Sequence, residues 1–122
     1  MIVGTSYSPP KAFISFAREF FERVAAGNYG AALGKLDSTA KRWTKSELVA
    51  LLNAASGGVG LSSCERIARS ASPTIIEEST NVYVLKHRIP IAGKWAPAKA
   101  VFRFSRKAGT EYFHVELESI EL

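Results

Sequence analysis

Three long segments of alternating apolar and polar residues near the C-terminus constrain the fold more than any other feature of the sequence. They are Thr80–Ala92, Ala96–Arg106 and Glu111–Ile120. Because successive side chains of a strand point to opposite faces, this alternation predicts strands with one packed and one solvated face. The connecting segments Ala92–Lys94 and Lys107–Gly109 contain the glycine that hairpin turns favour. The sequence therefore predicts a three-stranded antiparallel sheet.

The two faces of this predicted sheet differ in polarity. The apolar face carries Tyr83, Leu85, His87, Ile89, Ile91, Ala98, Ala100, Phe102, Phe104, Phe113, Val115 and Leu117. The mixed, polar face carries Val82, Val84, Lys86, Arg88, Pro90, Lys99, Val101, Arg103, Ser105, Tyr112, His114, Glu116 and Glu118. We therefore expect helices to cover the first face and to leave the second largely in water.

The requirement that like faces pair also predicts a register. The expected pairs on the apolar face are Phe104 with Phe113, Phe102 with Val115, His87 with Phe102, and Leu85 with Phe104. On the polar face this register aligns Lys86, Arg103 and His114 in one row. It also places Lys99 opposite Glu118.

The residues before the sheet predict helices. Ser8 followed by Pro9 is typical of a helix start, with the serine as N-cap and the proline at the first helical position. The apolar residues that follow recur at helical spacing and form a wide stripe: Phe13, Phe16, Ala17, Phe20, Phe21 and Val24. Gly27 is expected to end this helix, and Asn28 to cap the next one.

Two further helices are predicted before the sheet. The second, Tyr29–Leu36, is short. The third starts at Thr44, which has the spacing of a capping box with Glu47, and runs to about Ala55. Trp43 is expected to be a structural anchor for this third helix.

The remaining segments carry weaker signals. Met1–Tyr7 is expected to be a loose lead-in, and Ser56–Gly60 a connector. The glycines of that connector follow a helix, which is not the context of a phosphate-binding loop. Short strands are expected within Cys64–Ser70, centred on Ile67, and at the sheet edge over Thr74–Glu78.

Length and composition predict one domain that spans residues 1–122. No apolar run approaches the roughly 20 residues that span a membrane, so we expect no membrane association. Cys64 is the one cysteine of the sequence. It permits no internal disulfide and no multi-cysteine zinc site, and it fits the cytoplasm.

The net charge is +5, and its distribution leaves two interpretations open. The 79–110 stretch contains no acidic residue, while the following strand carries several glutamates. Cross-strand charge pairing on a solvated face is the favoured interpretation. The alternative is an interface or anion-binding patch made of Lys86, Arg88, Val101, Arg103 and His114. Nucleic-acid binding is less favoured, because this stretch lacks exposed aromatic residues on which bases would stack.

One family resemblance accompanies these patterns. In Phe20–Leu33 a long helix, a glycine with a polar residue, and a short helix with an aromatic start and Ala-Ala-Leu follow one another. With the closing strands, this order resembles the nuclear transport factor 2-like (cystatin-like) superfamily. The resemblance implies an α+β fold in which N-terminal helices pack on a curved antiparallel sheet and form a cone. In particular, the chain resembles small bacterial members, some of which are associated with immunity to toxins.

The resemblance also implies two classes of function. Some members are ketosteroid isomerases, dehydratases, epoxide hydrolases or polyketide cyclases, with carboxylates, tyrosines or histidines inside the cone. Other members only bind partners, often as dimers packed sheet to sheet.

His87 and Tyr83 are the titratable residues of the predicted inner face, and no Asp or Glu of the three strands lies there. This departs from the enzymes of the family, so we expect no catalytic residue, no metal and no cofactor. A lone histidine on an apolar face is typical of a hydrogen-bonded core residue. The alternative is a ligand pocket formed by His87, Tyr83, Phe102, Phe104 and Phe113.

The first functional hypothesis is therefore a non-enzymatic binding protein. It would hold a protein partner with an acidic surface, or a second copy of itself, through the sheet face or the mouth of the cone. Val101 is expected at such an interface, so Val101→Glu would disrupt a dimer. The second hypothesis is a small-molecule enzyme or ligand carrier that uses the pocket around His87.

Overall fold

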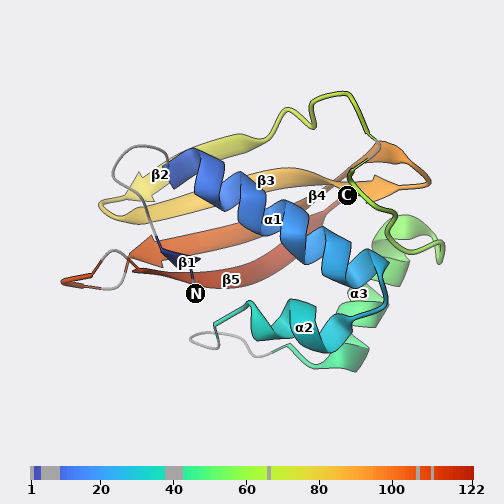
Figure 1. The fold of residues 1–122 in the computed structure, drawn as a ribbon, viewed down its shortest axis with the longest axis horizontal. Coiled ribbons are helices and arrows are strands. Elements are labelled where there is room, and N and C mark those ends of the chain that lie inside the picture. Colours follow the sequence, from blue (N-terminus) through green and yellow to red (C-terminus); the bar gives the residue numbers. More distant parts are fainter. Residues whose placement is uncertain (1, 4–8, 38–42, 66, 107, 111) are drawn as a thin grey trace.

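The computed structural model describes residues 2–3, 9–37, 43–65, 67–106, 108–110 and 112–122. Its elements, in chain order, are β1 (Ile2–Val3), α1 (Pro9–Ala25), α2 (Tyr29–Gly34), α3 (Lys45–Ser56), β2 (Thr74–Ser79), β3 (Val82–Ile91), β4 (Lys94–Arg106) and β5 (Tyr112–Glu121). The fold is α+β, as expected, with helices first and a C-terminal antiparallel sheet (Figure 1).

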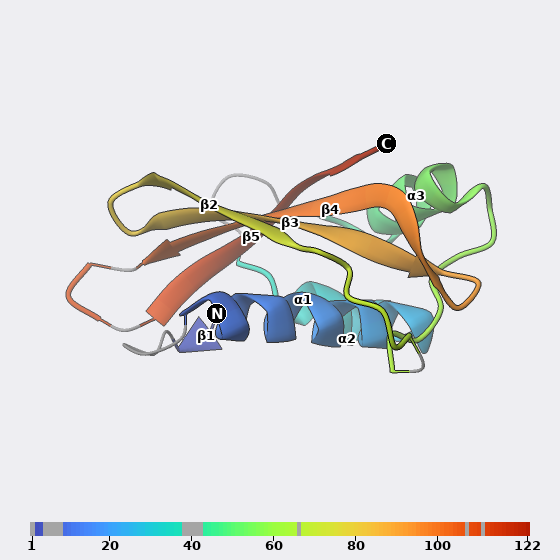
Figure 2. The same cartoon turned by 90° about the horizontal axis from the view of Figure 1, so that it is seen from above.

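The strands form one sheet in the order β1-β5-β4-β3-β2, and all neighbours are antiparallel. The three predicted long strands are its centre, and the predicted edge strand is confirmed as β2. Helices α1 and α2 lie on one face of the sheet (Figure 2), while α3 contacts β5. The helical layer therefore covers the face whose residues are apolar.

Aromatic rings fill the space between α1 and the sheet. The predicted stripe of α1 is buried in full. The ring of Phe13 stacks on that of Phe104 at 4.1 Å between centroids. The rings of Phe16 and Phe20 meet Phe102 edge-on at 6.0 and 5.4 Å. This packing follows from the helical spacing of the phenylalanines, because each turn of α1 presents rings to the same face.

The predicted helix boundaries are close to the observed ones. Helix α1 begins at Pro9, while Ser8, the predicted N-cap, lies outside the described residues. The capping box of α3 is confirmed, since Thr44 and Glu47 exchange hydrogen bonds of 3.1 and 3.2 Å. Trp43 anchors the start of α3 by donating its Nε1–H to the carbonyl oxygen of Leu117 at 2.7 Å.

The second helix and its cap follow the same local rules. Asn28 caps α2, because its side chain accepts a hydrogen bond from the backbone of Ala31 at 3.2 Å. Helix α2 ends at Gly34, two residues before the predicted end at Leu36. The three predicted helices are therefore confirmed, and the errors are confined to their ends.

The predicted register is wrong by two residues on both sides of β4. The observed pairs are Leu85 with Phe102, Tyr83 with Phe104, His87 with Ala100, Phe104 with Val115, and Phe102 with Leu117. The turn between β3 and β4 contains only Ala92 and Gly93, both with positive φ. The turn after β4 is longer than predicted, since Arg106 pairs with Phe113. A shift by an even number of residues keeps every side chain on its face, so the predicted inner face survives.

The two-residue register shift, together with irregularities within the strands, overturns the predicted polar rows. The register shifts between Arg88 and Pro90 on β3, and between Val101 and Phe102 on β4. The expected row of Lys86, Arg103 and His114 does not form. Lys86 pairs with Val101, Arg103 with Val84 and Glu116, His114 with Ser105, and Lys99 with Glu121 instead of Glu118.

Val101 was expected to be exposed on the polar face, but its exposed fraction is 4%. Lys86 on β3 lies opposite Val101, and its ammonium reaches Glu121 on β5 at 2.9 Å. This ion pair joins the two strands that flank β4, on the face that carries Val101. Val101 therefore belongs to the packed part of the molecule.

This burial gives Val101→Glu a different expected result. We expect the change to lower the free energy of unfolding by about 1–3 kcal/mol, because it introduces a carboxylate at a buried position. Val84→Glu is the matched control, because Val84 is half-buried and pairs with Arg103. Urea denaturation measures both changes. Equal, small losses for the two variants would contradict the burial of Val101.

Two other segments differ from expectation. Within the predicted lead-in, Ile2 and Val3 pair with β5 as the short strand β1. The described residues of Cys64–Ser70 contain no strand, so that prediction is wrong. There the backbone of Ile67 donates to the carbonyl oxygen of Cys64 at 3.1 Å, which makes a turn. This segment forms one wall of the site described next.

Candidate anion-binding cleft

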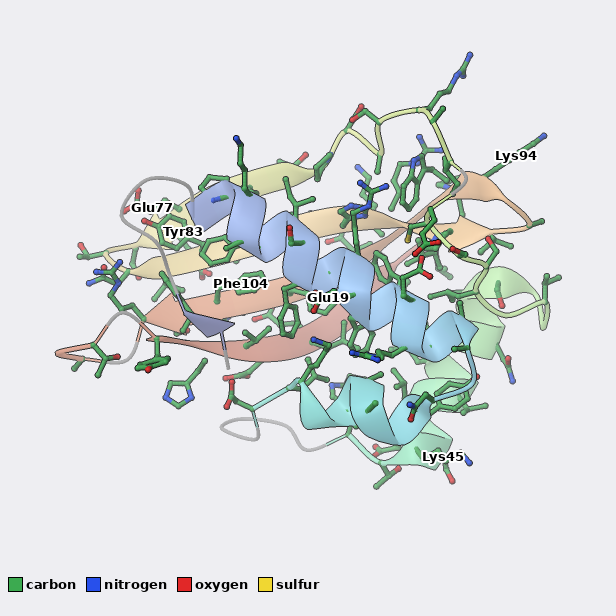
Figure 3. All side chains as sticks on the ribbon, viewed as in Figure 1. Glu19, Lys45, Glu77, Tyr83, Lys94 and Phe104 are labelled. Atoms are coloured by element: carbon green, nitrogen blue, oxygen red, sulfur yellow. The ribbon has the colours of Figure 1, made fainter. Side chains whose placement is uncertain are left out.

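A cleft of about 530 Å³ lies where the β3–β4 hairpin meets the segment before β2. Its lining consists of Ile67, Ala68, Arg69, Ser70, Arg88, Gly93, Lys94 and Trp95. A smaller cavity of about 160 Å³ is lined by Ile14, Arg18, Arg69, Ser70, Ala71, Pro73, His87 and Trp95. The two spaces adjoin, because Arg69, Ser70 and Trp95 line both. Figure 3 shows Lys94 at the end of the molecule opposite Glu77.

Backbone and hydroxyl contacts fasten the start of the cleft wall to the hairpin. The backbone N–H of Ser62 donates to the carbonyl oxygen of Pro90 at 2.9 Å. The Ser62 hydroxyl accepts from the backbone of Gly93 at 3.0 Å. Further along the wall, the indole Nε1–H of Trp95 donates to the carbonyl oxygen of Arg69 at 2.7 Å. The hairpin therefore holds both ends of this segment.

Helix α1 holds the same segment from the other side through Glu22. The carboxylate of Glu22 accepts from the Ser63 hydroxyl at 3.0 Å and from the backbone N–H of Cys64 at 2.5 Å. Burial raises the pKa of the Cys64 thiol to about 12, and the nearby Glu22 carboxylate adds to this shift. The thiol is therefore protonated at neutral pH and is a structural group, not a nucleophile.

Arg88 is held in place by the backbone of β4. Its Nε–H donates to the carbonyl oxygen of Ala96 at 2.7 Å, and its Nη2 donates to that of Trp95 at 2.5 Å. Both carbonyls lie in the part of β4 where pairing with β3 shifts register. The irregularity thus turns two backbone acceptors toward one guanidinium group.

The cleft and the cavity together are strongly cationic. Arg69, Arg88 and Lys94 line the cleft, and Arg18 lines the cavity. The guanidinium carbon of Arg18 lies 5.6 Å from the centroid of the Trp95 ring. Within the described part of the chain, no carboxylate forms an ion pair with any of these four side chains. Among the described residues, no ion pair therefore neutralises the cations of this lining.

His87 lies at the inner cavity and is almost fully buried, with an exposed fraction of 1%. Its Nδ1 lies 2.7 Å from the carbonyl oxygen of Arg88. Because a carbonyl oxygen only accepts, Nδ1 carries the proton and Nε2 carries the lone pair. Burial lowers the pKa of His87, and the positive charge of Arg18 lowers it further. The ring is therefore neutral at neutral pH.

The predicted ligand pocket does not form as a unit. Phe102, Phe104 and Phe113 lie in the packed core. Tyr83 packs against Phe13 and Phe113, with ring centroids 5.4 and 6.1 Å apart, and Figure 3 places Tyr83 near Glu77, far from Lys94. Of the five predicted pocket residues, His87 is the one that lines the cavities described above.

The polar face of the sheet carries paired charges. Lys86 binds Glu121 at 2.9 Å. Arg103 contacts Glu118 on one side and Glu78 on the other, the latter at 2.7 Å. This confirms the interpretation of the polar face as cross-strand charge pairing.

The residues of the predicted anion patch do not lie together, because the ion pairs just described and the observed register separate them. Of its five residues, Arg88 alone lines the cationic cleft. Val101 is buried, and Lys86 and Arg103 are paired with carboxylates. His114 has its Nδ1 3.7 Å from a carboxylate oxygen of Asp37.

No sequence pattern predicted Arg18, Arg69 or Trp95 as a member of the site. Lys94 was predicted to lie in the hairpin turn of the acid-free stretch and was not assigned to a site. These residues come from α1, from the wall segment and from β4, so no local spacing relates them. The one sequence signal that pointed here is the absence of acidic residues around the β3–β4 hairpin.

The structure offers neither a metal-binding cluster nor a membrane-spanning helix within its described residues. Among the described residues, no group of three or more His, Cys, Asp and Glu side chains is placed to hold a metal ion. None of the helices in the described ranges combines the length and apolar character needed to cross a membrane. Comparisons with protein-family models, with curated proteins and with solved structures found no match.

Proposed function

We propose that the chain forms a nuclear transport factor 2-like cone and works as a non-enzymatic binding protein. Its site is the cationic cleft at the mouth of that cone, and its partner is a protein that presents acidic side chains. An immunity-type role agrees with this proposal, provided that the target has an acidic surface.

One observation carries the proposal. The cations of the cleft, Arg69, Arg88 and Lys94, have no ion-paired carboxylate among the described residues, whereas Lys86 and Arg103 on the sheet face do. Unpaired cations grouped in one cleft attract and orient a negatively charged partner. Paired cations offer little to a partner, so a sheet-to-sheet homodimer is the less favoured arrangement.

The chemistry of the cavities supports binding over catalysis. Neither lining contains an Asp or Glu among the described residues. The imidazole of His87 uses Nδ1 to hold the backbone of Arg88, and the thiol of Cys64 is protonated. A general acid–base pair that acts on a substrate would need titratable partners within hydrogen-bond reach of each other.

Charge reversal in the cleft tests the proposal. We expect fluorescein-labelled hexaglutamate peptide to bind the protein, with an affinity that falls as salt increases. Lys94→Glu is expected to weaken this binding about threefold to tenfold, because the cleft then carries a like charge. Fluorescence anisotropy measures the dissociation constants.

Lys11→Glu is the matched control for Lys94→Glu. Lys11 is exposed in the first turn of α1, away from the cleft lining, and its reversal changes the net charge equally. A general charge effect would weaken binding equally in both variants and would contradict a site in the cleft. Peptide that does not bind at low salt would contradict an acidic partner.

A second candidate function is a carrier of small ligands in the cavity at His87. It is favoured by one observation, the 160 Å³ cavity next to a histidine whose Nε2 is a hydrogen-bond acceptor. Native mass spectrometry of freshly purified protein tests it. A small extra mass that His87→Phe abolishes would support the carrier, and protein of the bare chain mass would oppose it.

A further inference from the structure

We propose that Arg88 is the anchor for a single oxyanion group, a carboxylate or a phosphate, bound end-on in the cleft. This inference rests on the proposed function, because it specifies which atoms of the cleft hold the acidic group and what that group is.

The backbone uses only part of the hydrogen-bonding capacity of Arg88. A guanidinium group has five N–H donors in one plane. The backbone carbonyls of Ala96 and Trp95 take one donor from Nε and one from Nη2. Of the three remaining donors, one on Nη1 points back along the side chain, while the other Nη1 donor and the second Nη2 donor share the end edge of the group. That edge has the fork geometry that binds two oxygens of a carboxylate or phosphate.

The guanidinium group of Arg88 is immobilised before any ligand binds. Arg88 is half-buried, and two hydrogen bonds hold its head, so little side-chain entropy is lost when an anion binds. A partly buried charge that lacks an opposite charge is costly, and an oxyanion in the cleft removes that cost. Arg69 and Lys94 line the same space and add attraction.

The surroundings of Trp95 exclude recognition of a ligand by stacking of an aromatic ring on the indole. Trp95 is 7% exposed, with Arg18 over its ring and His87 edge-on at 5.2 Å. No face of this indole is left for a ligand ring to stack on. The cleft, at about 530 Å³, is large enough for a small ligand or an acidic side chain. Recognition therefore depends on the oxyanion itself.

Side-chain NMR of the wild-type protein tests the anchor directly. Inorganic phosphate and succinate are the two probes, and chloride at equal ionic strength is the reference. We expect saturable chemical-shift changes of the Arg88 Nε–H and the Trp95 indole N–H. Stronger binding of phosphate would assign the natural group to phosphate, and stronger binding of succinate to carboxylate. Changes that do not saturate, or that chloride reproduces, would overturn the proposal and indicate charge screening.

Arg88→Lys keeps the charge but removes the fork, so it tests the end-on geometry. We expect it to weaken binding of the better probe about tenfold. Arg106→Lys is the matched control, because Arg106 is exposed at the other end of β4. Wild-type affinity in Arg88→Lys would overturn the proposal. If Arg88→Lys fails to fold, the saturation of the wild-type Arg88 signal decides the matter alone.

The same variants separate this inference from the proposed function. If hexaglutamate binding depends on Lys94 but is unchanged in Arg88→Lys, the result supports an acidic partner and contradicts Arg88 as the anchor. If phosphate or succinate saturates the Arg88 signal while hexaglutamate does not bind, the result supports Arg88 as the anchor and contradicts an acidic protein partner.

Discussion

Replacing Phe104 with alanine is expected to lower the free energy of unfolding by about 3–5 kcal/mol. Phe104 has an exposed fraction of 0% and stacks on Phe13 at 4.1 Å. It also meets Phe16 at 5.8 Å and Phe102 at 6.4 Å. The change removes a ring that joins α1 to the centre of the sheet. The cost combines the lost burial of the ring with the cavity left among the surrounding rings.

Urea denaturation of the Phe104→Ala variant measures this loss. Tyr112→Ala is the matched control, because Tyr112 is an aromatic residue of β5 with an exposed fraction of 47%. We expect the control to lose less than about 1 kcal/mol. A similar shift of the midpoint in both variants would contradict the layered core between α1 and the sheet.

Acidification is the second change with a large expected effect. The folded state holds His87 neutral, because burial and Arg18 lower its pKa below the ordinary value of 6.5. The unfolded chain binds a proton at His87 as the pH falls through that ordinary value, and the folded chain does not. The free energy of unfolding therefore contains the full contribution of neutral His87 above this pH. This contribution declines below it, until the pH reaches the lowered pKa of the folded state. Because one group titrates, the slope is at most about 1.4 kcal/mol per pH unit.

Denaturation curves between pH 8 and pH 5, at constant ionic strength, measure this slope. His87→Phe keeps a ring against Phe21 and Trp95 but cannot titrate, so its stability is expected to vary much less over this range. His114→Gln is the control for the other histidine of the chain. A slope that persists in His87→Phe and disappears in His114→Gln would show that His87 is not the group responsible.

Local chemistry made the helices and the inner face of the sheet predictable. The capping box of Thr44 and Glu47, the spacing of the phenylalanines in α1 and the period-two pattern of the strands each act within a few residues. Such signals survive errors elsewhere. The inner face remained correct although the register was shifted by two residues, because a shift by two leaves each side chain on its face.

Strand irregularities explain why the polar face was not predictable. The register shift beside Val101 leaves Glu118 without a partner in β4, and Glu118 contacts Arg103. Glu78 lies at the register shift between Glu77 and Ser79 and contacts the same arginine. A pattern read at a constant period cannot contain these extra residues. The two-residue register shift and these extra residues together made the predicted polar rows wrong, and Val101 is buried instead of exposed.

The sequence by itself determined the order of the elements, the packed face of the sheet and the absence of acidic residues around the β3–β4 hairpin. Tertiary structure alone decided where the cations gather. These cations, Arg18, Arg69 and Lys94, are far apart in the chain. Their segments are brought together by hydrogen bonds that Glu22 and Ser62 accept and that Trp95 donates. The physical reason is one of range. Periodicity and capping depend on neighbours along the chain, whereas the potential of a cleft depends on charges that only folding brings close in space.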